Sequence, residues 1–335
     1  MAARIAVDAM GGDHAPRAIL EGAVTALRED RDLRLLLAGR REAIEPFLAD
    51  AADVRERAEV VPAADVIGMD DPPVEALRAR KDSSLAAVVR LAAQGEADAA
   101  ISAGNTGAFA AACQLKMRPL SCVDRPGIAV TIPAFHGPFV ICDVGANIQA
   151  KPRHLYEYGV MASEYARMIL GIADPRVGVL SVGEESEKGT RLVRQTHELL
   201  EADAGIRFIG NVEGRDLFND RCDVAVCDGF VGNVILKLVE GLAEGLFRTL
   251  AHEVREEPDR ARERMQATLE RVWKRHDYSE YGGAPLLGID GVSVVCHGRS
   301  ERRAIANAIK AAKRFVALGF KERVIERLSG AALRG

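Results

Sequence analysis

The sequence predicts an α/β protein with a three-layer αβα sandwich, in which helices cover both faces of a largely parallel sheet. Short apolar runs recur along the chain, and most of them end in a polar loop rich in glycine. The runs lack the polar alternation of a strand with one solvated face, so each is expected to be buried on both sides. Helical segments separate the runs, and this alternation is typical of a sheet with crossover helices.

The expected strands are short and hydrophobic. Gly11 and Gly12 break the first strand, and Gly39 closes the second. Val182 is included as a buried residue at the end of the fifth strand, whereas the stretch that begins at Val60 is interpreted as a linker. Strands are expected at residues 5–8, 33–38, 98–101, 139–143, 177–182, 223–228 and 293–296.

The expected helices follow these strands, and local signals mark where several of them begin. Pro16 suits a first helical turn, and Ser83 and Ser84 offer an N-cap. Helices are expected at residues 16–28, 43–51, 74–80, 85–94, 108–117, 156–170, 190–200, 234–251 and 303–318.

The composition limits the class of protein. The 335 residues are 48% hydrophobic and 28% charged, which supplies a large core. A formal net charge of -4 argues against a nucleic-acid partner but leaves phosphate-sized ligands open. The chain has no leader-like start and no apolar run of bilayer length, so we expect a cytoplasmic protein. Six cysteines without a C-x-x-C pair predict buried reduced thiols and no metal site.

Polar side chains follow the ends of the expected strands. These residues are Asp8, Asn105, Asn147, Lys188, Asn233 and His297. Ligands in parallel α/β sheets bind at the carboxyl ends of the strands, so we expect these loops to converge on one edge. For any single Asn or Asp, the alternative is a turn residue that serves only the backbone.

The loop before the helix at residues 190–200 points to an anion. Lys188 lies between glycines at a helix start, where backbone N–H groups and the helix dipole favour phosphate. Lys188 precedes Gly189, whereas nucleotide-binding loops read G-x-x-x-x-G-K-[ST], so a triphosphate site is not supported. The alternative is an ordinary turn with a solvated lysine.

A charged amphipathic helical segment is expected at about residues 252–278, inserted in a single α/β unit that spans residues 1–335. Met265, Leu269, Val272 and Trp273 share one face of this helix. The stripe packs on the body or on a second subunit, or it docks a partner or a membrane. The basic residues of the segment are Arg255, Arg260, Arg262, Arg264, Arg271, Lys274 and Arg275.

Six motifs, taken in order, resemble one known family. They read D-A-M-G-G-D, S-A-G-N-T-G-A, D-V-G-A-N, S-V-G-E-E-x-x-K-G, C-D-G-F-V-G-N and Y-x-G-A-P-L-L-G. The chain resembles the bacterial phosphate acyltransferases of the PlsX family from about Ile5 to Ser300. The resemblance implies transfer of a fatty acyl group from acyl carrier protein to inorganic phosphate, which yields acyl phosphate for phospholipid synthesis.

The resemblance also implies a fold like that of the phosphotransacetylases and isocitrate dehydrogenase-like enzymes, in a homodimer without metal or cofactor. Lys188 and Asn233 match the catalytic lysine and asparagine of the family. The residues implied to bind substrate or phosphate are Asp8, Gly11, Gly12, Asn105, Thr106, Asp143, Asn147, Glu184, Gly189 and His297.

Two departures from the family pattern stand out. The family often carries an acidic residue two places after G-A-N, where this chain has Ile148 and Gln149. Many relatives also have a longer, more apolar segment before Y-S-E-Y-G-G-A-P, which is implicated in membrane attachment. Here that segment is short and charged, so an acidic acyl carrier protein is the expected partner, with a peripheral membrane contact or a glycerol-3-phosphate acyltransferase contact as alternatives.

Attack of phosphate on a thioester carbonyl creates a tetrahedral oxyanion, and such a site needs cations and N–H donors. We expect Lys188 to neutralise the phosphate or the oxyanion, and Asn233 to hold the carbonyl oxygen. A rival mechanism forms an acyl-enzyme on Cys227 or Cys296, near His297. The alternative functions are an isocitrate-type dehydrogenase on the same fold and a non-catalytic phosphate-binding scaffold.

Overall fold

The computed structural model describes residues 2–256, 258–276 and 278–332. Its strands are β1 (Ala3–Asp8), β2 (Leu33–Gly39), β3 (Ala58–Pro62), β4 (Ala99–Ser102), β5 (Gly127–Ile132), β6 (Phe139–Cys142), β7 (Arg176–Leu180), β8 (Arg207–Val212), β9 (Val224–Val226), β10 (Ala284–Leu287) and β11 (Val292–Val295). They form one sheet in the order β3-β2-β1-β4-β11-β10-β5-β6-β9-β7-β8.

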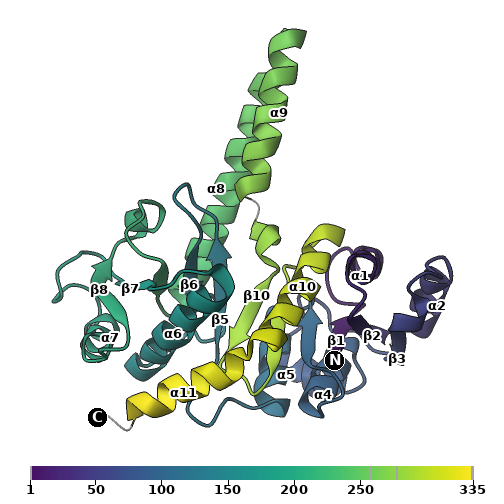
Figure 1. Cartoon of the computed structure of the whole chain (residues 1–335), viewed down its shortest axis with the longest axis horizontal. Coiled ribbons are helices and arrows are strands. Elements are labelled where there is room, and N and C mark those ends of the chain that lie inside the picture. The colour runs from purple at the N-terminus through teal and green to yellow at the C-terminus, as the bar shows by residue number, and fades with distance from the viewer. Residues whose placement is uncertain (1, 257, 277, 333–335) are drawn as a thin grey trace.

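Helices cover both faces of this sheet (Figure 1). They are α1 (Arg17–Glu29), α2 (Arg41–Ala49), α3 (Pro73–Ala79), α4 (Ser84–Ala93), α5 (Thr106–Lys116), α6 (Pro152–Tyr165), α7 (Arg191–Glu201), α8 (Gly229–Glu256), α9 (Asp259–His276), α10 (Arg302–Leu318) and α11 (Phe320–Ala332). The predicted three-layer α/β fold is confirmed. The sequence did not predict β3, β5, β8, β10 or α11, and Val182 lies outside β7 with 82% of its surface exposed, so its predicted burial was wrong.

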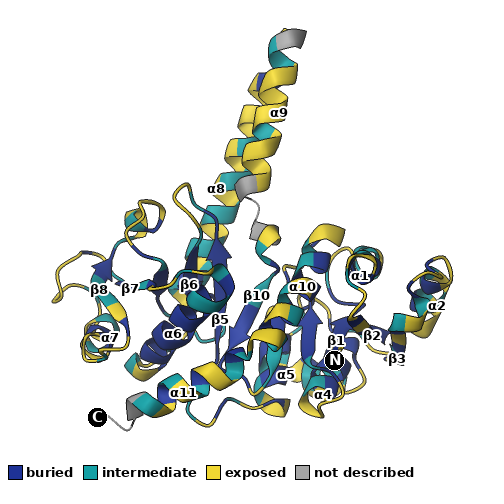
Figure 2. Ribbon diagram, viewed as in Figure 1, coloured by how far each residue is buried: buried dark blue, intermediate teal, exposed yellow. Residues whose placement is uncertain are grey.

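Alternate residues of each strand supply the two sides of the core. On β1, Ile5 and Val7 pack with α1 and α10, whereas Ala6 faces the side of α4 and α5. Farther along the sheet, α6, α7 and α11 cover one face and the first turns of α8 cover the other. Burial on both faces explains why these strands are continuously apolar (Figure 2).

The strands of the two halves of the sheet run in opposite directions. Strand β10 is antiparallel to both β11 and β5, and β5 is antiparallel to β6. As a result, the carboxyl ends of β1, β4 and β11 lie on one edge of the sheet, which we call the β1–β4–β11 edge. Those of β6, β7 and β9 lie on the other, the β6–β7–β9 edge. The prediction that all the polar loops meet at a single edge was therefore wrong, because it overlooked the two short reversing strands.

Helix α8 links the two edges. It begins at Gly229 beside the loop that follows β6, and Ile235 and Val239 pack into the core. Farther along α8, the Oε2 atom of Glu240 lies 3.9 Å from Nε2 of His297, a residue just past the end of β11. The rest of α8 leaves the body and pairs with α9 in a projecting hairpin (Figure 1). None of the described helices is both long and apolar enough to cross a membrane.

Two glycines of α8 test how tightly this helix is seated. A Cβ atom on Gly232 would lie 1.9 Å from the carbonyl oxygen of Asp143, whereas one on Gly241 would meet nothing within 4 Å. We expect Gly232→Ala to lower the free energy of unfolding by about 3 kcal/mol through overpacking. Gly241→Ala, the matched control, should raise it by about 0.5–1 kcal/mol because alanine favours the helix. Unfolding in urea measures both, and equal effects of the two variants would contradict the packing described here.

Candidate functional site

At the β1–β4–β11 edge, the predicted site residues mostly bond to the protein itself. Asp8 is buried and accepts hydrogen bonds from the backbone N–H of Met10 (3.2 Å) and the hydroxyl of Ser102 (2.7 Å). Burial raises the pKa of Asp8, and these hydrogen bonds oppose that shift. A Cβ on Gly11 would lie 2.7 Å from the backbone nitrogen of Gly104, so glycine is needed for the two loops to touch.

The side chain of Asn105, at the same edge, uses both its oxygen and its amide nitrogen in hydrogen bonds within the protein. Asn105 caps α5 by accepting from the N–H of Ala108 (3.0 Å), and its amide group donates to the carbonyl oxygens of Gly68 (3.2 Å), Met69 (3.0 Å) and Asp71 (2.9 Å). Its donors are therefore committed to holding the loop before α3.

The remaining predicted residues of this edge are more accessible. Thr106 is exposed at the first residue of α5, and Gly12 adopts a positive φ of 106° next to the loop that carries His297. The side chain of His297 is 40% exposed and faces Glu240 of α8. A role of these residues in phosphate binding stays a prediction.

At the β6–β7–β9 edge, Asp143 organises the first loop. Its buried carboxylate accepts N–H groups from Ile128 (2.9 Å), Gly145 (3.2 Å), Ala146 (3.0 Å) and Asn147 (2.7 Å). Burial raises the pKa of Asp143, and the four N–H groups act against it by stabilising the charged form. The carboxylate therefore fixes the loop. Its described hydrogen bonds all come from backbone N–H groups, and none of them points to a direct role in binding phosphate.

The loop after β7 presents Lys188 to solvent. Its ammonium group makes no ion pair with any residue that the structure describes, while Glu184 of the same loop lies 3.6 Å from Arg221. Gly189 has a positive φ of 91°, and a Cβ there would lie 2.8 Å from the hydroxyl of Ser181. That conformation bends the chain from the loop into α7, whose N-cap is Thr190.

Asn233 lies in the first turns of α8, beside the loop organised by Asp143. A Cβ on Gly145 would be 3.9 Å from Cβ and Cγ of Asn233. The half-buried amide of Asn233 has no hydrogen-bond partner among the described residues. Because β7 and β9 are parallel neighbours, Lys188 and Asn233 follow the same ends of adjacent strands.

One further group of this edge was not singled out from the sequence. The hydroxyl of Ser181 is buried and has no partner in the part of the chain that the structure describes. Serine in a strand-to-loop motif carries no signal of its own, so only the structure reveals this group. Three donors of this edge thus have no described protein partner: the hydroxyl of Ser181, the ammonium of Lys188 and the amide of Asn233. A buried hydroxyl without a partner is unusual, and a set of such donors is typical of a binding site.

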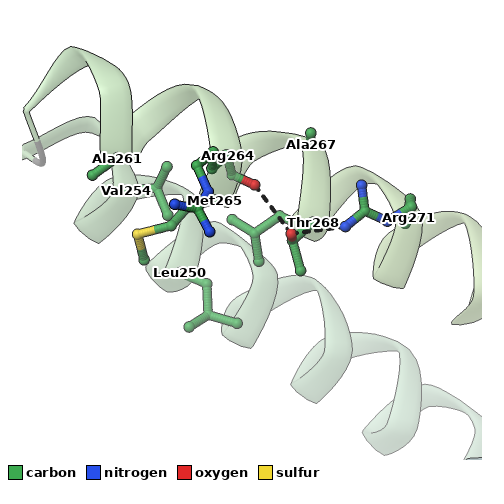
Figure 3. A pocket seen from close by; sticks show the side chains of 9 residues that line it. Leu250, Val254, Ala261, Arg264, Met265, Ala267, Thr268 and Arg271 are labelled. Atoms are coloured by element: carbon green, nitrogen blue, oxygen red, sulfur yellow. Dashed lines mark hydrogen bonds between the residues drawn. The ribbon is translucent and has the colours of Figure 1, made fainter.

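Two hollows lie along the projecting hairpin. One, of about 710 Å³, runs between α8 and α9, where Arg264 and Arg271 flank the apolar side chains of Leu250 and Met265 (Figure 3). The other, of about 470 Å³, is bordered by Phe247 and Trp273, whose rings meet edge to face at 4.7 Å. The apolar stripe predicted on α9 therefore packs partly on α8. The side chains of Arg260 and Arg275 lie outside the described residues.

The cysteines are free, and all except Cys122 are buried. Burial raises the pKa of Cys296 to about 12 and that of Cys227 well above its ordinary value. Such thiols are poor nucleophiles at neutral pH because the thiolate is the reactive form. Among the described residues, no group of three or more His, Cys, Asp or Glu side chains is placed to hold a metal ion.

The fold is that of the phosphotransacetylases. A phosphotransacetylase from Streptococcus pyogenes superposes with a TM-score of 0.64 at 16% identity, over 93% of this chain and 94% of that one. A branched-chain phosphotransacylase from Enterococcus faecalis V583 gives a TM-score of 0.59 at 14% identity, over 94% and 99% of the two chains.

Sequence comparison identifies the family within this fold. Residues 3–323 match the family model described as fatty acid synthesis protein. The phosphate acyltransferase of Heliobacterium modesticaldum is 47% identical over 98% of both chains, and that of Desulfitobacterium hafniense is 45% identical over 97% of both. The chain belongs to the phosphate acyltransferase (PlsX) family and is an acyltransferase, as its motifs predicted.

The burial of the cysteines can be tested by alkylation. In the native protein at pH 8, iodoacetamide should modify Cys122 first, and Cys227 and Cys296 should react at least about 100-fold more slowly than a free thiol because their thiolates are suppressed. Peptide mass spectrometry follows each site, and the protein unfolded in guanidinium is the control in which all the cysteines react. Rapid modification of Cys227 or Cys296 with loss of turnover would revive the acyl-enzyme mechanism.

Proposed function

We propose that the enzyme transfers a fatty acyl group from the thioester of acyl carrier protein to inorganic phosphate. An oxygen of hydrogen phosphate forms a bond to the carbonyl carbon, the C–S bond breaks, and the electron pair leaves with sulfur. The sulfur takes up the proton that the phosphate gives up, and it ends as the thiol of the carrier. The reaction balances without a cofactor. The acyl phosphate then serves glycerol 3-phosphate acylation in phospholipid synthesis.

The observation that carries this proposal is the set of open donors at the β6–β7–β9 edge. Lys188 supplies a cation without an ion-pair partner in the described chain, and Asn233 supplies an amide without a hydrogen bond. Lys188 neutralises phosphate or the developing oxyanion, and Asn233 donates to the carbonyl oxygen. Backbone N–H groups of the loop at Gly189 complete the phosphate cradle, because those of Gly145, Ala146 and Asn147 are bonded to Asp143. Donors that are already in place need no reorganisation when the oxyanion forms.

The β1–β4–β11 edge has a supporting role in this proposal. The hydrogen bonds of Asp8 and Asn105 hold the loops of this edge in place. These two residues therefore shape the surface near Gly12, Thr106 and His297. Helix α8 joins this edge to Asn233 through the contact between Glu240 and His297.

We also propose that the enzyme is a homodimer in the cytoplasm. Six apolar side chains along α8 are exposed at intervals of four residues: Phe230 (64%), Val234 (51%), Leu238 (66%), Leu242 (68%), Leu246 (55%) and Leu250 (39%). A stripe of this kind on a projecting helix is typical of a helix–helix contact, and a second copy of the chain would cover it. Sedimentation equilibrium tests this, since a mass of 36.1 kDa at micromolar concentration contradicts it.

The hairpin is proposed to dock acyl carrier protein. Arg264 and Arg271 stand beside the apolar groove between α8 and α9 (Figure 3), so the surface offers positive charge around a hydrophobic contact. Such charge steers an acidic partner and raises its association rate, and salt weakens the effect. A peripheral membrane contact or contact with the glycerol-3-phosphate acyltransferase is the competing use of this surface.

Removal of the open donors should abolish most of the turnover. We expect Lys188→Ala and Asn233→Ala each to lower kcat about 100-fold or more while the fold persists, as loss of one oxyanion donor typically does. The controls are Glu187→Ala in the same loop and Asn219→Ala, whose amide donates to the carbonyl of Arg215. Acyl phosphate formation from acyl carrier protein is measured, and near-normal turnover in either variant removes that residue from the mechanism.

Charge reversal on the hairpin should specifically weaken the binding of acyl carrier protein. We expect Arg264→Glu with Arg271→Glu to raise the KM for acyl carrier protein about tenfold at low salt, and less at high salt, because steering is screened. The control is Arg90→Glu, an exposed residue of α4 far from the hairpin in the chain. An unchanged KM together with lost binding to anionic liposomes would show that the surface serves a membrane instead.

A further inference from the structure

A cavity of about 660 Å³ lies against the loop that Asp143 organises. Its lining residues are Asp124, Arg125, Asn147, Ile148, Gln149, Lys151 and His154. The segment 124–125 precedes β5, and the segment 147–154 leads from β6 into α6, so the cavity belongs to the β6–β7–β9 edge. Through Asn147 it adjoins the loop that contacts Asn233, yet none of its other residues belongs to the site described above.

His154 gives the cavity a neutral N–H donor. The residue is only 6% exposed, and its Nδ1 accepts the backbone N–H of Lys151 at 3.2 Å. Because Nδ1 accepts, the proton of the neutral ring must sit on Nε2. Burial lowers the pKa of His154, which favours the neutral ring at pH 7. Nε2 has no partner among the described residues and is not an enclosed atom, so it opens into the cavity that His154 lines.

Two cations of the cavity are not neutralised. Among the described residues, the side chain of Arg125 bonds only to the side-chain oxygen of Gln114 (3.3 Å), and Lys151 pairs with no carboxylate. Arg153 is different, since its guanidinium is held by Glu157 at 2.8 Å. Asp124 is the one carboxylate on the wall, so a negative charge faces two positive charges. The balance favours an anion with several acceptor oxygens.

Asn147 adds an acceptor. Both hydrogens of its amide nitrogen are used, one on the carbonyl oxygen of Pro126 (2.6 Å) and one on the hydroxyl of Tyr158 (2.8 Å). Its side-chain oxygen, Oδ1, has no partner within the described chain and can therefore accept from a ligand, whereas its backbone carbonyl already accepts the N–H of Gly229. Inorganic phosphate alone would leave this acceptor without a partner. A phosphate ester that also carries amide or hydroxyl hydrogens would satisfy it.

We propose that this cavity binds the phosphodiester of a pantetheine arm, through which an acyl thioester is attached to its carrier protein. Arg125, Lys151 and the Nε2–H of His154 bind the phosphate oxygens, and Oδ1 of Asn147 accepts an N–H or O–H of the arm. The inference rests on the proposed use of acyl carrier protein. It places the phosphate end of the arm beside the loop that contacts Asn233, and the thioester, at the other end of the arm, would react at the open donors of the same edge. Inorganic phosphate shares the anionic chemistry and is the competing source.

The test compares donors with and without the phosphate. Turnover of the full-length enzyme is measured with acyl carrier protein, acyl-phosphopantetheine and acyl-pantetheine, and inorganic phosphate is varied separately. We expect Arg125→Ala and Lys151→Ala each to raise the KM for acyl-phosphopantetheine about tenfold, as loss of a charge-assisted hydrogen bond does. The KM values for acyl-pantetheine and inorganic phosphate should not change. Lys116→Ala, an exposed lysine in the last turn of α5, is the control.

Substitution of His154 separates binding from structure. His154→Gln can keep a neutral N–H donor and should retain most of the affinity for acyl-phosphopantetheine, whereas His154→Leu should lose it. If His154→Leu does not fold, the Arg125 and Lys151 variants carry the test. An increase in the KM for inorganic phosphate instead of the donor would overturn the assignment to the arm, and unchanged KM values in all variants would overturn the site.

Direct binding distinguishes this inference from the proposed function. Calorimetry with 4′-phosphopantetheine needs no turnover, and we expect the wild-type enzyme to bind it and the Arg125→Ala/Lys151→Ala double variant to bind it at least about 100-fold more weakly. Binding without acyl phosphate formation would refute the proposed function and keep the site. Normal turnover of acyl carrier protein by the double variant would refute the site and keep the function.

Discussion

The buried carboxylate of Asp143 is the constraint on which the β6–β7–β9 edge depends. Its four backbone hydrogen bonds join the end of β6 to the start of β5 and curl residues 145–147 into a tight loop. The same loop seats α8, because Gly229 and Gly232 approach it too closely for any side chain. Burial of a carboxylate is costly unless several donors surround it. The loop geometry and the buried carboxylate of Asp143 therefore stabilise each other, and the position of Asn233 follows from both.

The sequence predicted the layers of the fold because burial on two faces leaves a strong apolar pattern. The strands that end at Asp8 and Cys142 and the amphipathic α10 are examples. It did not predict β5 and β10, although each is short and apolar, because a run of this length has no period that separates it from a loop or a helix. These two strands reverse the direction of the sheet. A local pattern does not show strand direction, so the arrangement of the loops at two edges could not be predicted from the sequence.

The candidate site was predictable in a different way. Motif resemblance marked Lys188 and Asn233 as catalytic and Asp8, Asn105 and Asp143 as binding residues, but the residue pattern by itself supplied no physical reason for this ranking. The structure separates them by hydrogen bonding. The side-chain oxygens of Asp143 and the amide of Asn105 are bonded to backbone groups. The ammonium of Lys188 and the amide of Asn233 have no partner among the described residues. A polar residue after a strand can thus serve the backbone or a ligand, and only its contacts in the folded chain decide which.

Helix α8 gives the molecule its long-range organisation. Its first turns carry Asn233, its middle reaches His297 through Glu240, and its far end forms the hairpin with α9. A continuous helix is stiff, so a partner held at Arg264 or Leu250 is fixed in distance from Asn233. A carrier that delivers its substrate on a flexible arm needs such a fixed distance, because the arm must span from the docking surface to the reacting atoms. The thioester end of the arm must reach Asn233, and the cavity at His154, which lies at the same edge, would hold the phosphate through which the arm joins the carrier.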